Sequence, residues 1–142
     1  MKKYDLSCLV PPGVNAKEEA QAIVLGLAAS VIFSFGFLIR LNKVCREAAA
    51  GAAESIPVFS KLLGNSLAGF VVMIIAMALL CIVHWHMHYK DSKSIYLLKR
   101  LPGKLELLRH TAGLPIAGAV LNIILALILF AVYFAVFNLY IW

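Results

Sequence analysis

The sequence predicts an all-α, polytopic membrane protein with three transmembrane helices and a short amphipathic cytoplasmic helix between the second and the third. Of its 142 residues, 63% are hydrophobic and only 14% are charged, and the mean hydropathy is +0.91. A soluble domain of this size needs far more polar surface. The apolar residues form three uncharged runs, each long enough for the ~20 helical residues that cross a ~30 Å hydrocarbon layer. The charged residues stand outside these runs.

The distribution of lysine and arginine between the loops predicts how the spans are oriented. The amino-terminal segment and the second loop lie on one side of the membrane, because two spans separate them, and together they carry nine of these residues; the first loop carries four. The positive-inside rule then places the amino terminus and the second loop in the cytoplasm, in a multi-pass protein of the cell's inner (cytoplasmic) membrane. The predicted layout is a single membrane domain, 1–142, with spans at about 20–39, 63–83 and 114–138, an outer loop at 40–62 and a cytoplasmic loop at 84–113.

Several function classes are disfavoured by the composition. The net charge of +6 is divided among segments that flank apolar runs, which is typical of membrane orientation, so we expect no nucleic-acid partner. Cys8, Cys45 and Cys81 are widely spaced and form no CxxC pair, so a disulfide framework or a zinc knuckle is not predicted. The chain has no GxxxxGKS-type phosphate loop and no pairing of nucleophile and base. We therefore expect a protein that is not an enzyme and needs no cofactor.

Three histidines follow the second apolar run in "HWHMHYK", residues 84–90. On a helix, His84 and His88 share one face while His86 points away, and His110 stands on the same side of the membrane. These residues leave open a metal or haem site formed by His84, His88 and His110. We favour an interfacial belt, in which each ring has one apolar and one wet side, because no carboxylate or thiolate is spaced to complete a metal shell.

The cytoplasmic loop has the pattern of a structured segment. Isoleucine or leucine recurs every three or four residues between 95 and 108, which predicts an amphipathic helix at about 93–101. Pro102 and Gly103 interrupt this pattern, and a new helix is expected to start at Lys104 and to lead into the third span. The apolar strip can lie on the inner leaflet with its basic residues towards anionic lipid. It can also fit a groove on a cytoplasmic partner, and one helix can do both.

Packing between the spans is predicted from small and polar residues. Lipid offers no hydrophobic gain for helix association, so close approach through small side chains matters more than in water. Asn122 is a strongly polar residue deep within the third span, and we expect it to hydrogen-bond a neighbouring helix or its own backbone. Pairs of small residues four apart mark candidate contact strips: Gly26 and Ser30, Gly64 and Ala68, and Gly113 and Ala117.

Around the second loop the sequence resembles small membrane proteins of the ABC-2-type transporter permease group from anaerobic Gram-positive bacteria. The similarity lies in "SKSIYL" at 92–97, two basic residues at 99–100, "LP" at 101–102 and an "ELxR" segment at 106–109. The entry "LGNSLAGF" to the second span and the aromatic run at 84–89, which is "YHYxxxY"-like, are similar as well. The resemblance extends from the outer loop to the third span.

This resemblance implies a permease subunit that works in substrate export with a separate ABC ATPase, contacted through the loop between spans two and three. Permease domains of this group usually have six spans, whereas this chain has three, so a homo-oligomer or a second permease subunit is implied. The alternatives are a small non-transport membrane protein, such as a regulator or an assembly subunit, and a His-liganded metal or haem subunit. The implied ATPase contact is formed by Ser92, Lys93, Ser94, Ile95, Tyr96, Leu97, Leu98, Lys99, Arg100, Leu101 and Pro102.

Overall fold

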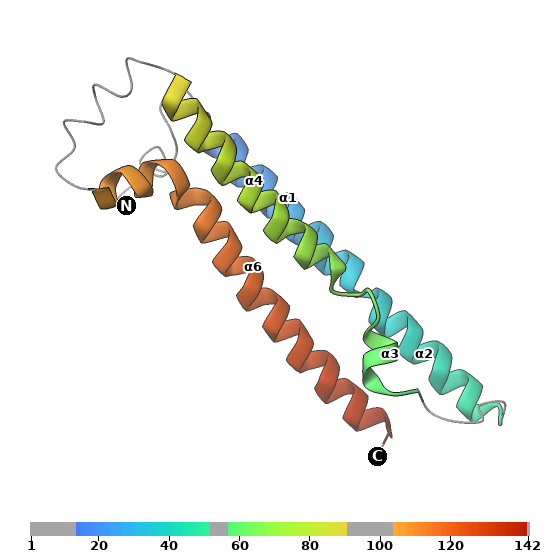
Figure 1. Ribbon diagram of the computed structural model, residues 1–142. Helices are drawn as coiled ribbons and strands as arrows, with labels where there is room; N and C mark the ends of the chain where they lie inside the picture. Colours follow the sequence, from blue (N-terminus) through green and yellow to red (C-terminus); the bar gives the residue numbers. More distant parts are fainter. Residues whose placement is uncertain (1–13, 52–56, 91–103, 142) are drawn as a thin grey trace, which may run out of the picture.

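The computed structural model describes residues 14–51, 57–90 and 104–141, and every regular element within these ranges is an α-helix. Helix α2 continues α1 nearly in line, and short α3 sits between α2 and α6 (Figure 1). Helix α4 packs against both α1 and α6. The predicted amphipathic helix at 93–101 falls outside these ranges. The helices are α1 (Ala16–Ser34), α2 (Gly36–Ala49), α3 (Phe59–Leu63), α4 (Ala68–Lys90) and α6 (Lys104–Ile141).

Three helical stretches are long and apolar enough to cross a membrane, namely Ala16–Ala49, Ala68–Met87 and Thr111–Tyr140. They confirm the prediction of a helical, multi-pass membrane protein. Helix α6 begins at Lys104, as predicted. The second apolar helix begins at Ala68 and not at residue 63, because the chain turns between α3 and α4.

The bundle has two ends that differ in character. The start of α1, the end of α4 and the start of α6 lie together (Figure 1). We call this the loop end, because residues 91–103 join α4 to α6 there. At the other end, which we call the far end, α2, α3 and the last turns of α6 meet.

The junction between α1 and α2 is a local break at Phe35. The Phe35 N–H donates to the carbonyl of Ile32 at 3.2 Å, which tightens the last turn of α1. The hydroxyl of Ser34 donates to the Val31 carbonyl at 2.7 Å, and a serine that bonds back in this way bends a helix. The Ser34 Oγ also lies 2.7 Å from the hydroxyl of Tyr133 on α6. Because the Ser34 proton is already used, the Tyr133 O–H is the donor of this second bond.

Aromatic side chains fasten the far end. Phe37 on α2 is fully buried and stacks on Tyr133, with ring centroids 4.7 Å apart. Phe59 on α3 meets several rings edge-on, with centroid distances of 5.3–5.7 Å. Such edge-to-face pairs add about 0.5–1.5 kcal/mol each beyond the area that they bury. The rings that contact Phe59 are Phe37, Phe130, Phe134 and Phe137.

A glycine turn separates α3 from α4. Gly64 has a φ of 43° and a ψ of −125°, a conformation that other residues rarely adopt. A Cβ added at this position would meet the guanidinium of Arg40 on α2. The turn therefore needs glycine for its backbone conformation, and the flexible end of the Arg40 side chain fills the space beside it.

Small residues let the helices approach closely, as the sequence predicts for the Gly26 and Ser30 strip. A Cβ on Gly26 would lie 2.5 Å from the sulfur of Met73, and one on Gly69 would lie 3.1 Å from the Cα of Ser30. At the contact with α6, a Cβ on Gly118 would lie 3.1 Å from Ile23. Gly69, which faces backbone, sets the spacing of α1 from α4, whereas Gly26 and Gly118 make room for neighbouring side chains.

Asn122 bonds a neighbouring helix, which is one of the two arrangements that the sequence predicts. Its Nδ2 donates to the backbone carbonyl of Phe70 on α4 at 2.9 Å, and its side chain is fully buried. The hydrogen bond ties the middle of α6 to the beginning of α4.

Candidate functional site

The predicted ATPase contact, residues 92–102, lies outside the described residues. The site is therefore built from the helices that lead into this loop, α4, which ends at Lys90, and α6, which begins at Lys104. Both helices carry buried polar groups at the loop end.

Pro115 creates the first part of this site. It lies inside α6 and has no N–H, so the carbonyl of Thr111, four residues earlier, lacks its usual helical donor. The Nδ1 atom of His84 on α4 lies 3.0 Å from that carbonyl oxygen. His84 is only 3% exposed and Thr111 only 2%. The imidazole therefore takes the place of the missing backbone donor at a break in α6.

Glu19 provides the second part of the site. Its Oε1 lies 3.3 Å from the Nε2 atom of His84, and the two side chains are 9% and 4% exposed. Within the described part of the chain, neither carboxyl oxygen of Glu19 accepts a hydrogen bond. A charge withdrawn from water is costly unless it is paired, so such residues in apolar segments are a strong functional indicator. Glu19, His84 and the Thr111 carbonyl, which we call the polar clasp, join α1, α4 and α6.

The first turn of α1 positions the acid. Asn15 caps the helix by accepting from the N–H of Lys17 at 3.3 Å, and its Nδ2 donates to Glu18 at 2.7 Å. Glu18 thus faces outward beside its cap, while Glu19, one residue later, turns towards the bundle. A carboxylate in the first turn is also favoured by the helix dipole.

Sequence reasoning missed Glu19 because an acid just before an apolar run is ordinary for a helix start. A signal was nevertheless present, because Glu19 shares a helical face with Ile23, Ser30 and Ser34, which are all buried. Pro115 carried a second signal. A proline inside a helix frees the carbonyl four residues earlier, so Thr111 needed a donor from elsewhere.

The histidines of the "HWHMHYK" run do not share one environment. His86 and Trp85 are exposed, as expected for an interfacial belt, whereas His84 is buried and has no wet side. The side chains of His88 and His110 lie outside the described residues. Among the side chains that are described, no three from His, Cys, Asp and Glu come together as metal ligands. Both ring nitrogens of His84 already face protein atoms, Thr111 O and Glu19 Oε1.

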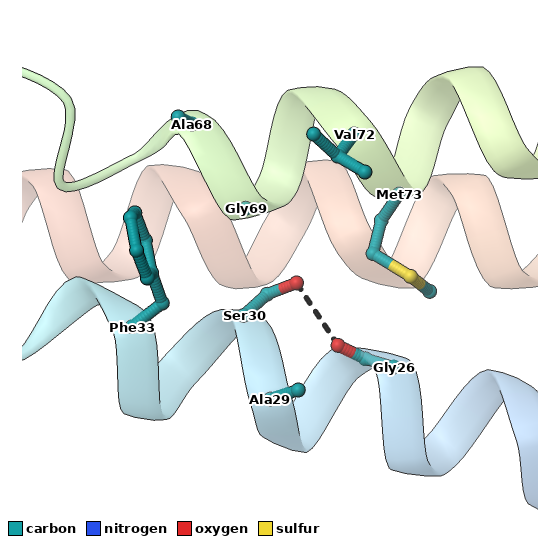
Figure 2. Close-up of a pocket in the computed structure, with 8 residues that line it drawn as sticks. All are labelled: Gly26, Ala29, Ser30, Phe33, Ala68, Gly69, Val72 and Met73. Atoms are coloured by element: carbon teal, nitrogen blue, oxygen red, sulfur yellow. Dashed lines mark hydrogen bonds between the residues drawn. The ribbon is translucent and has the colours of Figure 1, made fainter.

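An apolar groove of about 410 Å³ runs between α1 and α4 (Figure 2). Gly69 on α4 faces Gly26 and Ser30 on α1, and Phe33 and Met73 lie towards its two ends. The Ser30 hydroxyl donates to the Gly26 carbonyl at 2.9 Å, so it is satisfied within its own helix. Among the described residues, the lining of the groove therefore presents an apolar surface with no free hydrogen-bonding group.

The fold and the clasp define a class, that of helical multi-pass membrane proteins with a buried acid and histidine pair. No family model, curated protein or solved structure matches the chain.

Proposed function

We propose that the chain is the membrane, permease-like subunit of an ABC-2-type transporter, coupling a separate ATPase to substrate export through the loop between α4 and α6. One observation carries this proposal furthest. The two helices that flank the loop are bonded to each other at its base, and to α1, through the polar clasp. A displacement of the loop would therefore be transmitted to all three apolar helices.

Such a displacement would be transmitted through α6. Thr111 lies seven positions after the start of α6 at Lys104, a rise of about 10 Å along a helix. Pro115 then interrupts the backbone hydrogen bonding, and prolines are common positions for helix kinks. The segment before Pro115 can pivot relative to the rest of α6. The hydrogen bond from His84 to Thr111 holds this pivot in the arrangement described.

The nature of the partner follows from the sequence resemblance. Tyr96, Leu97, Lys99 and Arg100 combine apolar anchors with positive charge, which suits a protein groove with an acidic rim. Nucleotide hydrolysis belongs to the ATPase, and the chain itself is not an enzyme. In this proposal the amino terminus and the loop face the cytoplasm at the inner membrane, and a second copy or another permease subunit completes the pathway.

Affinity purification tests the proposal. The tagged chain is extracted from its native membrane in mild detergent, and mass spectrometry identifies the proteins retained with it. We expect a stoichiometric ABC ATPase that is lost when Lys99→Glu and Arg100→Glu are combined. The matched control is Lys43→Glu with Arg46→Glu, which makes the same charge change at exposed positions on α2 and should keep the ATPase. Recovery of homo-oligomers alone from several detergents would refute the transporter role and favour a regulator or assembly subunit.

A further inference from the structure

The groove between α1 and α4 (Figure 2) lies in the half of the bundle nearer the far end. Its lining comes from residues 26–33 of α1 and 68–73 of α4, both within stretches apolar enough to cross a membrane. Val72 is 63% exposed and Phe33 56%, so the sides of the groove face away from the bundle. Lipid hydrocarbon surrounds a helix at this depth. The groove is therefore filled from the bilayer and not from water.

The length of this part of the chain corresponds to one leaflet of a bilayer. Arg40 on α2 lies fourteen positions after Gly26, a rise of about 21 Å along the helices. Half of a bilayer measures about 15 Å through the hydrocarbon and about 20–22 Å with the headgroups included. With Gly26 near the midplane, Phe33 lies within the hydrocarbon and Arg40 lies at the depth of the lipid phosphates.

Arg40 places a positive charge beyond the outer end of the groove. Its guanidinium lies beside Gly64, in the turn that leads into Ala68, a lining residue. Arg40 also stands seven positions after Phe33, a spacing that keeps two residues on one helical face. The Arg40 side chain is exposed and, among the described residues, forms no ion pair. Because a guanidinium binds phosphate oxygens through parallel N–H groups, Arg40 is suited to a phospholipid headgroup.

We propose that the groove and Arg40 form a binding site for one anionic phospholipid, with an acyl chain in the groove and the headgroup phosphate on the guanidinium. A volume of about 410 Å³ holds on the order of ten methylene groups, each close in size to a water molecule with its ~30 Å³. The acid on α2, Glu47, faces Lys43 at 3.8 Å, so α2 offers no free carboxylate to the ammonium of a zwitterionic headgroup. The site lies in the leaflet opposite the loop between α4 and α6 and does not depend on an ATPase partner.

A helix from a second copy of the chain is the other occupant to consider. An α-helix with its side chains is about 10–12 Å across, whereas Phe33 and Met73 limit the groove to about 10 Å along α1. The small residues of the groove already serve the contact between α1 and α4, since a Cβ on Gly69 would lie 3.1 Å from the Cα of Ser30. A narrow acyl chain therefore fits the groove better than a helix does.

Titration of the purified full chain in detergent micelles with phosphatidylglycerol tests the charged part of the site, with native mass spectrometry counting the lipid retained. We expect one tightly held molecule per chain, and a Kd raised at least about tenfold by Arg40→Gln, which removes a charge-assisted hydrogen bond. Arg46→Gln removes the same charge from an exposed position further along α2 and should change the Kd by less than about twofold. Equal effects of the two substitutions would overturn the proposal.

The same titration tests the groove through two neighbouring alanines. Ala28 and Ala29 are both exposed, and only Ala29 lines the groove. The ring of Ala29→Phe displaces several methylene groups from the groove, so we expect this variant to weaken lipid binding at least about tenfold. Ala28→Phe should change it by less than about twofold. If Ala29→Phe left lipid binding unchanged and converted a dimer to a monomer, the groove would hold a second copy and the proposal would be wrong.

A further measurement on the wild-type chain does not depend on the folding of any variant. The chain is placed in vesicles of phosphatidylcholine and phosphatidylglycerol, in which the phosphatidylglycerol carries a photoreactive diazirine on its acyl chain. We expect the cross-links to concentrate at residues 26–33 and 68–73. An even spread over exposed apolar positions, including Leu127 and Leu139 on α6 with 63% and 80% exposure, would show that the groove selects no lipid.

Discussion

Ser34 and Ser66 are both buried near the α1–α2 break, but their hydroxyls differ in hydrogen bonding. The Ser34 Oγ donates to the Val31 carbonyl and accepts from Tyr133, both at 2.7 Å. The Ser66 Oγ would lie 3.8 Å from a Cβ on Gly36 and has no hydrogen-bond partner within the described residues. The same substitution, serine to alanine, should therefore have opposite effects at the two positions.

The magnitudes follow from the contacts. An unpaired buried hydroxyl costs about 1–3 kcal/mol, part of which Ser66→Ala recovers, so we expect stabilisation by about 1 kcal/mol. Ser34→Ala removes two hydrogen bonds of about 0.5–1.5 kcal/mol each and leaves the Tyr133 hydroxyl without its acceptor. We expect it to destabilise the fold by about 1–3 kcal/mol. The two variants should therefore differ by about 2–4 kcal/mol.

Denaturant unfolding in micelles, followed by helical circular dichroism, measures this difference for the full chain. Tyr133→Phe provides an internal check, because it removes the same bond as Ser34→Ala. Combining the two should cost less than the sum of the single changes, since both act on one bond. If Ser66→Ala destabilised the chain as much as Ser34→Ala, the Ser66 hydroxyl would have a native partner and the reasoning would be wrong.

The same unfolding assay tests two further contacts. Gly69→Leu places a side chain against the Ser30 backbone. It should lower the free energy of unfolding by about 1–3 kcal/mol, because two helix backbones must move apart. The control is Val72→Leu on the same helix, where the Val72 side chain is 63% exposed, and it should change this free energy by less than about 0.5 kcal/mol. Phe59→Ala removes the ring that contacts four others and should lower the free energy of unfolding by about 2–4 kcal/mol. The control is Val58→Ala at the neighbouring position, where the side chain is 66% exposed. It should change the free energy of unfolding by less than about 0.5 kcal/mol. A Phe59 effect no larger than that of Val58 would show that α3 does not depend on the aromatic contacts.

Features that depend on neighbouring residues could be read from the sequence. Uncharged runs of sufficient length predicted the three apolar helices, because hydrophobic thickness alone decides their length. Pro102 and Gly103 predicted that a helix starts at Lys104, where α6 begins. Asn122 was expected to hydrogen-bond a neighbouring helix or its own backbone, because a polar amide in an apolar environment must find a partner.

Features that depend on distant partners were not visible. His84 and Glu19 are 65 positions apart, and each has an ordinary explanation when it is considered alone, as an interfacial ring and as a first-turn acid. The break between α3 and α4 was hidden for a different reason. The segment carries no charge, so it was assigned to the second span in spite of Asn65 and Ser66, although Gly64 has a backbone conformation that residues other than glycine rarely adopt.

The two ends of the bundle are held together by different chemistry, and only the loop end adjoins the proposed ATPase contact. At the far end, rings from α2, α3 and α6 interlock, and separating them would forfeit several contacts of about 0.5–1.5 kcal/mol each. At the loop end, Ile23 on α1, Met77 on α4 and Leu114 on α6 form a small buried aliphatic cluster beside the polar clasp, and the hydrogen bond from His84 to Thr111 lies beside a proline break in α6. A neutral hydrogen bond contributes only about 1 kcal/mol net. In the proposed transporter, force on the loop therefore acts on this aliphatic cluster and on the polar clasp before it reaches the interlocked rings of the far end.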